Sequence, residues 1–126
     1  TELYQDSEAT FPKIGLGRFV VVGNDDREAL RIARRAYPVW HRSFNYLFRL
    51  KGSTPKHQRP PDFDGVMASG QGIAGSPDTV RSFLQSQLKT AGANYLVGQF
   101  AFGDISLEEA LRSVGLFSVN VVPGLV

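Results

Sequence analysis

The sequence contains no cysteine among its 126 residues. Without cysteine the chain has no disulfide framework, no cysteine-based metal site or redox pair, and no thiol nucleophile. Long apolar runs are missing as well, because none approaches the roughly 20 residues that are needed to cross a bilayer. No basic segment followed by an apolar stretch marks a secretory signal. These absences predict a cytoplasmic protein with no membrane partner.

Recognisable catalytic and cofactor motifs are also absent. We find no paired carboxylates arranged for acid–base chemistry and no residues with metal-ligand spacing. Residues 15–17 (GLG) lack the third glycine of a dinucleotide-binding loop, and they precede an apolar run instead of following one. The sequence therefore identifies no catalytic residue by motif, and we expect no metal.

Apolar residues make up 42% of the chain, which is enough for a real core in one ordinary domain. The charges are mixed in sign, so the composition is not that of a disordered chain. We therefore expect a single domain over residues 1–126. The first residue is Thr1 instead of methionine. Either the initiator was removed or the chain is a piece of something longer.

Basic residues are concentrated between positions 27 and 59, where Glu28 is the one acid. The nine basic residues of this band are Arg27, Arg31, Arg34, Arg35, Arg42, Arg49, Lys51, Lys56 and Arg59. Such a band can attract nucleic acid or anionic ligands. However, the first four arginines fall mostly on the outer face of a predicted helix, and no aromatic platform accompanies them. A solvated helix face is the better interpretation, so we expect no nucleic-acid partner.

The first half of the chain predicts a strand followed by a helix. Residues 18–22 (RFVVV) form a β-branched run typical of a strand that is buried on both faces. Residues 25–28 (DDRE) resemble a capping box with Asp in place of Ser, and helical spacing of apolar residues follows. Pro38 removes a backbone donor, so the helix should kink or break there before it resumes towards Gly52.

The second half predicts two further strand–helix pairs after a long loop at residues 53–72, which is rich in proline and glycine. Residues 72–75 (GIAG) form a short strand, and residues 76–79 (SPDT) begin a helix with a serine cap and proline at its first position. Residues 95–100 (YLVGQF) form the last strand, and residues 106–109 (SLEE) are a capping box. The final helix should end at Pro123-Gly124. Its predicted apolar face comprises Leu107, Ala110, Leu111, Val114, Phe117 and Val121.

This alternation of strands and helices predicts an α/β fold whose β-α units feed a parallel sheet. At this point the motifs resemble the carboxy-terminal end of the luciferase-like flavin-dependent monooxygenases, the bacterial luciferase family. Residues 19–47 are similar to the preceding β-α unit of that family, more loosely. The motifs that carry the likeness are Gly75-Ser76-Pro77, Asn94 to Phe100, Phe102-Gly103, Ser106 to Glu109, and Phe117 to Pro123.

The resemblance implies part of a (β/α)₈ TIM barrel, about the last three β-α units, since a whole barrel takes about 250 residues. The missing neighbour of these units would be the amino-terminal barrel portion. Three strands alone would expose sheet edges and the apolar face that lines a barrel interior. Hence we expect either a fragment of a longer enzyme or a chain that buries those surfaces by forming a homo-oligomer.

The resemblance also implies candidate cofactor-binding residues. Gly75 and Ser76 begin a helix after a strand, where free N–H groups suit the phosphate of a flavin. Asp78 would repel such an anion, and an ordinary capped helix is the alternative interpretation.

For substrate binding the candidates are Gln99, Phe100, Phe102 and Gly103, at the carboxyl end of a strand, with core and rim packing as the alternative. His41 could serve as a proton donor or anion contact, with a surface or packing role as the better interpretation. His57, in the long loop, is better interpreted as a solvated side chain.

By resemblance, the chain is expected to be part of an enzyme that oxidises a small organic substrate with O₂, using FMN or a deazaflavin. The cofactor carries such chemistry, so no catalytic triad is expected and the catalytic residues stay unknown. Alone, the chain should be inactive. The alternative is a non-catalytic assembly module that completes its core by self-association.

Overall fold

A computed structural model describes residues 15–53 and 59–125 of the chain. Over these ranges none of the helices is both long and apolar enough for a membrane span. Histidine and carboxylate side chains in the same ranges form no group of three that would hold a metal ion. The elements are β1 (Gly15–Val22), α2 (Asp26–Leu50), α3 (Phe63–Ala68), β2 (Gly72–Gly75), α4 (Pro77–Ala91), β3 (Tyr95–Gln99), α5 (Leu107–Leu116), a π-helical segment η1 (Phe117–Val121) and α6 (Val122–Leu125).

The three strands form one parallel sheet in the order β2-β1-β3, as predicted for an α/β chain. β1 pairs with β2 through its second half, from Phe19 to Val22, and with β3 through its first half, from Gly15 to Phe19. In a closed barrel, strands that follow one another in the chain are neighbours, so β2 would lie in the middle. Here the central strand is β1.

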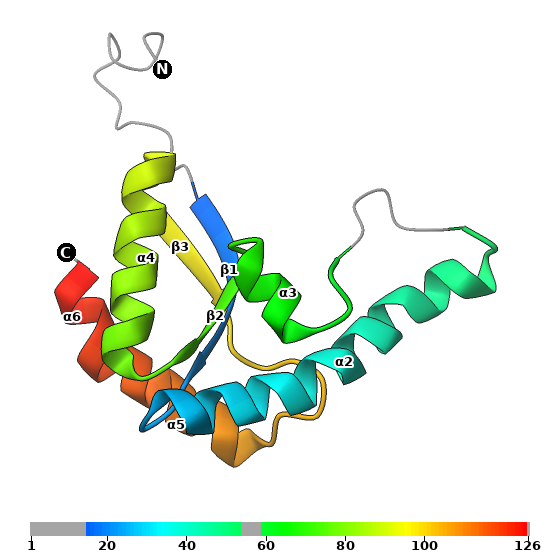
Figure 1. The fold of residues 1–126 in the computed structure, drawn as a ribbon, viewed down its shortest axis with the longest axis horizontal. Coiled ribbons are helices and arrows are strands. Elements are labelled where there is room, and N and C mark those ends of the chain that lie inside the picture. Colours follow the sequence, from blue (N-terminus) through cyan, green and yellow to red (C-terminus); the bar gives the residue numbers. More distant parts are fainter. Residues whose placement is uncertain (1–14, 54–58, 126) are drawn as a thin grey trace, which may run out of the picture.

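Helices cover both faces of this sheet (Figure 1). On one side α2 and α3 pack on Phe19 and Val21, while α4 and η1 pack on Val20 and Val22 from the other. All four side chains are at most 3% exposed, as predicted for a strand buried on both faces. The expected exposure of a barrel-lining face is therefore wrong for β1, because a connecting helix lies on each side.

An aromatic cluster forms most of the core beneath α2. The ring of Phe19 packs edge-to-face against Tyr37 at 5.4 Å, Trp40 at 4.9 Å and Phe102 at 5.1 Å. Phe63 of α3 stacks on Phe102 at 6.2 Å. Such pairs add about 0.5–1.5 kcal/mol each beyond the area that they bury. The cluster joins α2, α3, β1 and the chain that follows β3.

The structure corrects two predictions in the first half of the chain. α2 does not break at Pro38 but runs unbroken from Asp26 to Leu50. Proline leaves the carbonyl of Arg34 without its helical partner; Arg34 is exposed, so water can replace that bond. The predicted loop at residues 53–72 contains α3, whose start is capped by Asp62, with its Oδ1 2.8 Å from the amide nitrogen of Gly65. Its residues 54–58, with His57, lie outside the described part.

The last helical stretch also differs from its prediction. It begins at Ser106 with both hydrogen bonds of the predicted capping box. It then passes through a π-helical turn and continues across Pro123-Gly124, where it was expected to end. Half of the predicted apolar face is turned outward: Leu107 is 76% exposed, Leu111 62% and Val114 42%, whereas Ser113 is 3% exposed. Helix α5 therefore presents a serine to the sheet and leucines to solvent.

A substitution at Gly103 tests how closely the β3–α5 connection packs on α2. Its φ is +60°, and a Cβ at this position would lie 1.9 Å from the carbonyl oxygen of Ala36. We expect Gly103→Ala to lower the free energy of unfolding by more than about 2 kcal/mol, because the left-handed conformation and the clash add. Urea unfolding followed by circular dichroism measures the change.

The matched control is Gly115→Ala in α5, where a Cβ would meet no atom within 4 Å. This replacement should raise the free energy of unfolding by about 0.5 kcal/mol, since alanine favours a helix over glycine. Equal effects of the two substitutions would contradict the close packing at Gly103.

Candidate functional site

The carboxyl edge of the sheet is where a parallel α/β protein places its ligands. In this chain α5 crosses that edge beneath the sheet, between the start of α2 and α6 (Figure 1). The hydroxyl of Ser113 accepts a hydrogen bond of 2.9 Å from the amide of Val22, the last residue of β1, and both groups are buried. The carboxyl end of the central strand is therefore closed by a helix.

The predicted phosphate site at Gly75 and Ser76 holds a carboxylate of the chain itself. Oδ1 of Asp26 accepts a hydrogen bond of 2.7 Å from the amide of Ser76. The Ser76 hydroxyl caps its own helix by accepting from the amide of Thr79 at 3.3 Å. A Cβ on Gly75 would lie 2.8 Å from Asp26 Oδ1, so the glycine allows the carboxylate to approach. Asp26 thus binds where the phosphate was expected.

The same contacts explain the acidity of Asp26. Hydrogen bonding from the Ser76 amide, and then from the Thr79 side chain, lowers the pKa of this carboxyl below its ordinary value. Asp26 is not among the residues predicted for this site, although the pair Asp25-Asp26 is a signal for it. Asp25 caps α2 by accepting from the amide of Glu28 at 2.8 Å, which leaves the second carboxylate free to reach α4.

These contacts decide whether a flavin phosphate could bind at the start of α4. One of the donors that the phosphate would need is engaged by Asp26, and Pro77 has no N–H. A phosphate beside an ionised carboxylate would also be repelled. In the chain as it stands, Gly75 and Ser76 do not fit a phosphate unless Asp26 moves away.

The four predicted substrate-binding residues do not converge on one surface. Gln99 is exposed at the end of β3, whereas Phe100 packs on the α4 side of the sheet, edge-to-face with Phe117 at 4.9 Å. Phe102 is 5% exposed in the aromatic cluster on the α2 side. Gly103 packs against the backbone of α2 at Ala36. Their roles in substrate binding stay a prediction, and Phe102 and Gly103 have a packing role in this structure.

An ion-pair cluster fixes the connection between β3 and α5 to α2. The guanidinium of Arg35 donates to both carboxylate oxygens of Glu109, at 3.0 and 2.6 Å, and to Asp104 at 3.2 Å. Glu109 also accepts from the amide of Ser106. Pairing with Arg35 lowers the pKa of Glu109 from 4.5 to about 2 and raises that of Arg35. Arg112 adds a second link to α2 through Glu28 at 2.9 Å.

The remaining basic and histidine candidates have ordinary contacts. Within the predicted basic band, Arg27 and Arg31 are exposed, and Arg34 pairs with Asp64 at 3.0 Å. The Nε2 atom of His41 lies 3.1 Å from the carbonyl oxygen of Arg59. His41 therefore joins α2 to the chain before α3.

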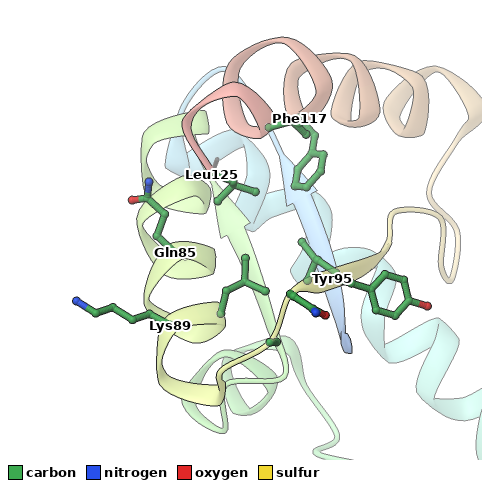
Figure 2. Close-up of a pocket in the computed structure, with 10 residues that line it drawn as sticks. Gln85, Lys89, Tyr95, Phe117 and Leu125 are labelled. Atoms are coloured by element: carbon green, nitrogen blue, oxygen red, sulfur yellow. The ribbon is translucent and has the colours of Figure 1, made fainter. Parts of the chain in front are cut away.

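An open pocket of about 590 Å³ lies at the amino end of β3, opposite the end that carries Gln99 (Figure 2). Its walls come from the end of α4, the start of β3, η1 and α6. Phe117 and Leu125 point towards the strand from the last helical segment, whereas Lys89 and Tyr95 point outward. The remaining lining residues are Gln85, Leu88, Ala93, Asn94, Leu96 and Val122. This pocket lies at the amino end of β3, away from the edge where barrel enzymes bind substrates.

Among known proteins, the uncharacterised protein y4wF of Sinorhizobium fredii is 35% identical over 109 residues. The match covers 86% of this chain and 32% of the relative. No protein-family model matches the chain. The chain thus spans about one third of the length of the curated relative that it matches.

Solved structures of monooxygenases share the fold. The monooxygenase RslO1 from Streptomyces bottropensis matches with a TM-score of 0.67 and 22% identity, over 94% of this chain and 33% of its own. The FMN complex of the oxygenating constituent of 3,6-diketocamphane monooxygenase from Pseudomonas putida, a type II Baeyer-Villiger enzyme, matches with a TM-score of 0.62 and 20% identity, over 89% and 33%. The predicted fold class, three parallel β-α units equivalent to part of a larger enzyme chain, is confirmed.

The Arg35–Glu109 pair makes stability dependent on pH. Because the pKa of Glu109 is lowered in the folded chain, its contribution is present above pH 4.5 and is lost as the pH falls towards about 2. Glu109→Gln should lower the free energy of unfolding by about 1 kcal/mol at pH 7, after screening of the pair by water, and by less at pH 3. Urea titrations at several pH values measure the difference.

Glu108→Gln is the control for this series, since Glu108 lies in the same helical turn and is exposed. Its replacement should alter stability much less at every pH. A Glu109→Gln effect that stayed constant from pH 7 to pH 3 would contradict the assigned ion pair.

A substitution at Asp26 tests the contact between this carboxylate and the start of α4. Asp26→Asn removes the negative charge at the start of α4 and should lower the free energy of unfolding by about 0.5–1 kcal/mol at low salt, and by less in 1 M salt. Asp25→Asn should change it little, because asparagine caps a helix as well as aspartate does. Indistinguishable variants would show that the Asp26–Ser76 contact is not made in solution.

Proposed function

We propose that this chain is part of a flavin-dependent monooxygenase of the luciferase-like kind, one that oxidises a small organic substrate with O₂. The observation that carries the proposal is the match of three parallel β-α units to monooxygenase chains, over 94% of this chain in the best of the cases above. One of those chains is described as a complex with FMN. FMN is therefore the proposed cofactor, with a deazaflavin as the alternative.

Under this proposal the chain supplies one part of the enzyme and not a complete active site. It spans about one third of the matched enzymes, and within it α5 closes the carboxyl end of β1 while Asp26 is bonded to the start of α4. In flavin enzymes the cofactor supplies the oxygen chemistry, while the protein binds it, orients it and excludes water. With Asp26 bonded to Ser76, the start of α4 does not fit a flavin phosphate, and we propose that the chain is inactive alone.

A second candidate is a non-catalytic module that self-associates. The exposed edge strand favours it, because Val97 is 51% exposed on β3 and no strand covers the outer edge within the described part of the chain. Light scattering at micromolar concentration separates the two candidates. A stable homodimer supports the module, and a monomer with a cooperative melt contradicts it.

Flavin binding tests the leading proposal. Oxidised FMN is titrated into this chain alone and into this chain together with the unmatched portion of the Sinorhizobium fredii relative, with flavin fluorescence as the readout. We expect no saturable quenching with the chain alone and saturable quenching with both parts, because the cofactor site needs elements of both. Oxygen uptake with reduced FMN is measured on the same samples.

A deazaflavin titrated in the same way distinguishes the alternative cofactor. Absence of binding by either cofactor to the combined parts, under conditions where both parts are folded, would refute the proposed function.

A further inference from the structure

The carboxyl half of α2 projects beyond the sheet and the other helices (Figure 1). In its amino half the helix buries five side chains in the core, which are Ala29, Ile32, Ala33, Ala36 and Tyr37. From His41 to Leu50, by contrast, none of the side chains that the structure describes is buried. This part of α2 is therefore accessible to a partner from outside the chain.

One face of the projecting half combines cationic and apolar side chains. Arg42, Tyr46 and Leu50 are spaced by four residues and Arg49 follows Arg42 by seven, so all four lie on one side of the helix. Both arginines are exposed, as are Tyr46 by 54% and Leu50 by 65%. Within the described part of the chain, neither arginine forms an ion pair or a hydrogen bond. We call these four residues the α2 patch.

The α2 patch has no packing role in the helix that carries it. The rings of Trp40, Phe44 and Phe48 form a row along another side of the same turns, with centroid distances of 4.9 and 5.7 Å. Trp40 also packs on Phe19 of the sheet, at 4.9 Å. The aromatic row therefore joins this half of α2 to the core, and the α2 patch is left for another purpose.

The charge around the α2 patch is of one sign. Glu28 is the last acidic residue of α2, and Lys51 adds a further exposed cation directly after the helix. Nearer the core, Arg34 and Arg35 are paired with Asp64 and Glu109 of the chain itself. No such carboxylate reaches the α2 patch from the described residues. A group of unpaired cations attracts a negatively charged partner.

The partner has to accept cationic and apolar side chains together. Nucleic acid would account for the arginines, but it gives no reason for an exposed leucine beside them. The surface of an anionic bilayer takes both, because arginine reaches the lipid phosphates, tyrosine lies at the boundary, and leucine enters the acyl layer. The prediction of no membrane partner rested on the absence of a spanning segment, and binding at the surface needs none.

We propose that the α2 patch (Arg42, Tyr46, Arg49, Leu50) binds the surface of an anionic lipid bilayer. The two arginines pair with lipid phosphates, Tyr46 and Leu50 enter the head-group boundary, and Lys51 adds to the attraction. With so few side chains, the binding is peripheral and reversible. The inference goes beyond the proposed function and does not depend on it, since no residue of the patch belongs to the candidate site.

Co-sedimentation with vesicles tests the α2 patch. The chain is mixed with vesicles of phosphatidylcholine alone, or of an equal mixture of phosphatidylcholine and phosphatidylglycerol, and its partition coefficient is measured. We expect binding to the mixed vesicles only, and weaker binding at high salt. Arg42→Gln and Arg49→Gln should each lower the coefficient about fivefold. Leu50→Ser should lower it about threefold or more without a change of charge.

The matched control is Lys89→Gln, which removes one positive charge from an exposed residue of α4, on the opposite side of the molecule (Figure 1). It should leave the partition coefficient nearly unchanged. All the variants should melt with the original chain, because the replaced side chains are exposed.

Several outcomes overturn the inference. One is the absence of binding to the mixed vesicles, and another is an equal loss for Lys89→Gln and Arg49→Gln, which would be an effect of net charge alone. A Leu50→Ser variant that binds as tightly as the original chain also overturns it. So does tighter binding to a single-stranded oligonucleotide than to the mixed vesicles at equal phosphate concentration, since the partner would then be nucleic acid.

Discussion

The crossing of the chain at Phe102 and Gly103 is the constraint on which the rest of the structure depends. Phe100 packs on the α4 side of the sheet, and two residues later Phe102 is buried among the aromatic rings on the α2 side. Gly103 then lies so close to the backbone of α2 that no side chain would fit. Because Phe117 must return to the α4 side, α5 has to run across the carboxyl edge of the sheet. This path turns Ser113 inward and Leu107, Leu111 and Val114 outward.

The same path has consequences for function. A parallel sheet offers its carboxyl edge to ligands, but here α5 covers the end of the central strand β1, and Asp26 is bonded to the start of α4. The chain spans about one third of the matched monooxygenase chains, and the carboxyl end of its central strand is closed by its own helix.

The sequence predicted the features that local physics determines. The helix starts at Asp25, Ser76 and Ser106 depend on caps within a few residues, and all three are present. The burial of β1 on both faces followed from its β-branched run. Features that depend on distant residues were missed: the central place of β1, the outward turn of α5, and the reach of Asp26 to Ser76 across fifty residues. Pro38 did not end α2, and Tyr37 and Trp40 on either side of it both pack on Phe19.

The orientation of α5 is the most direct point at which to test this account, and the absence of cysteine makes the test simple. Single cysteines are introduced as Leu111→Cys and Ser113→Cys, and the rate of modification by a thiol reagent is measured on the folded chain. The account predicts that the cysteine at 111 reacts at nearly the rate of a free thiol, while the one at 113 reacts only when the chain unfolds. Protection at 111 with free reaction at 113 would mean that α5 packs its leucines on the sheet, and would contradict the closure of the carboxyl end of β1 by Ser113.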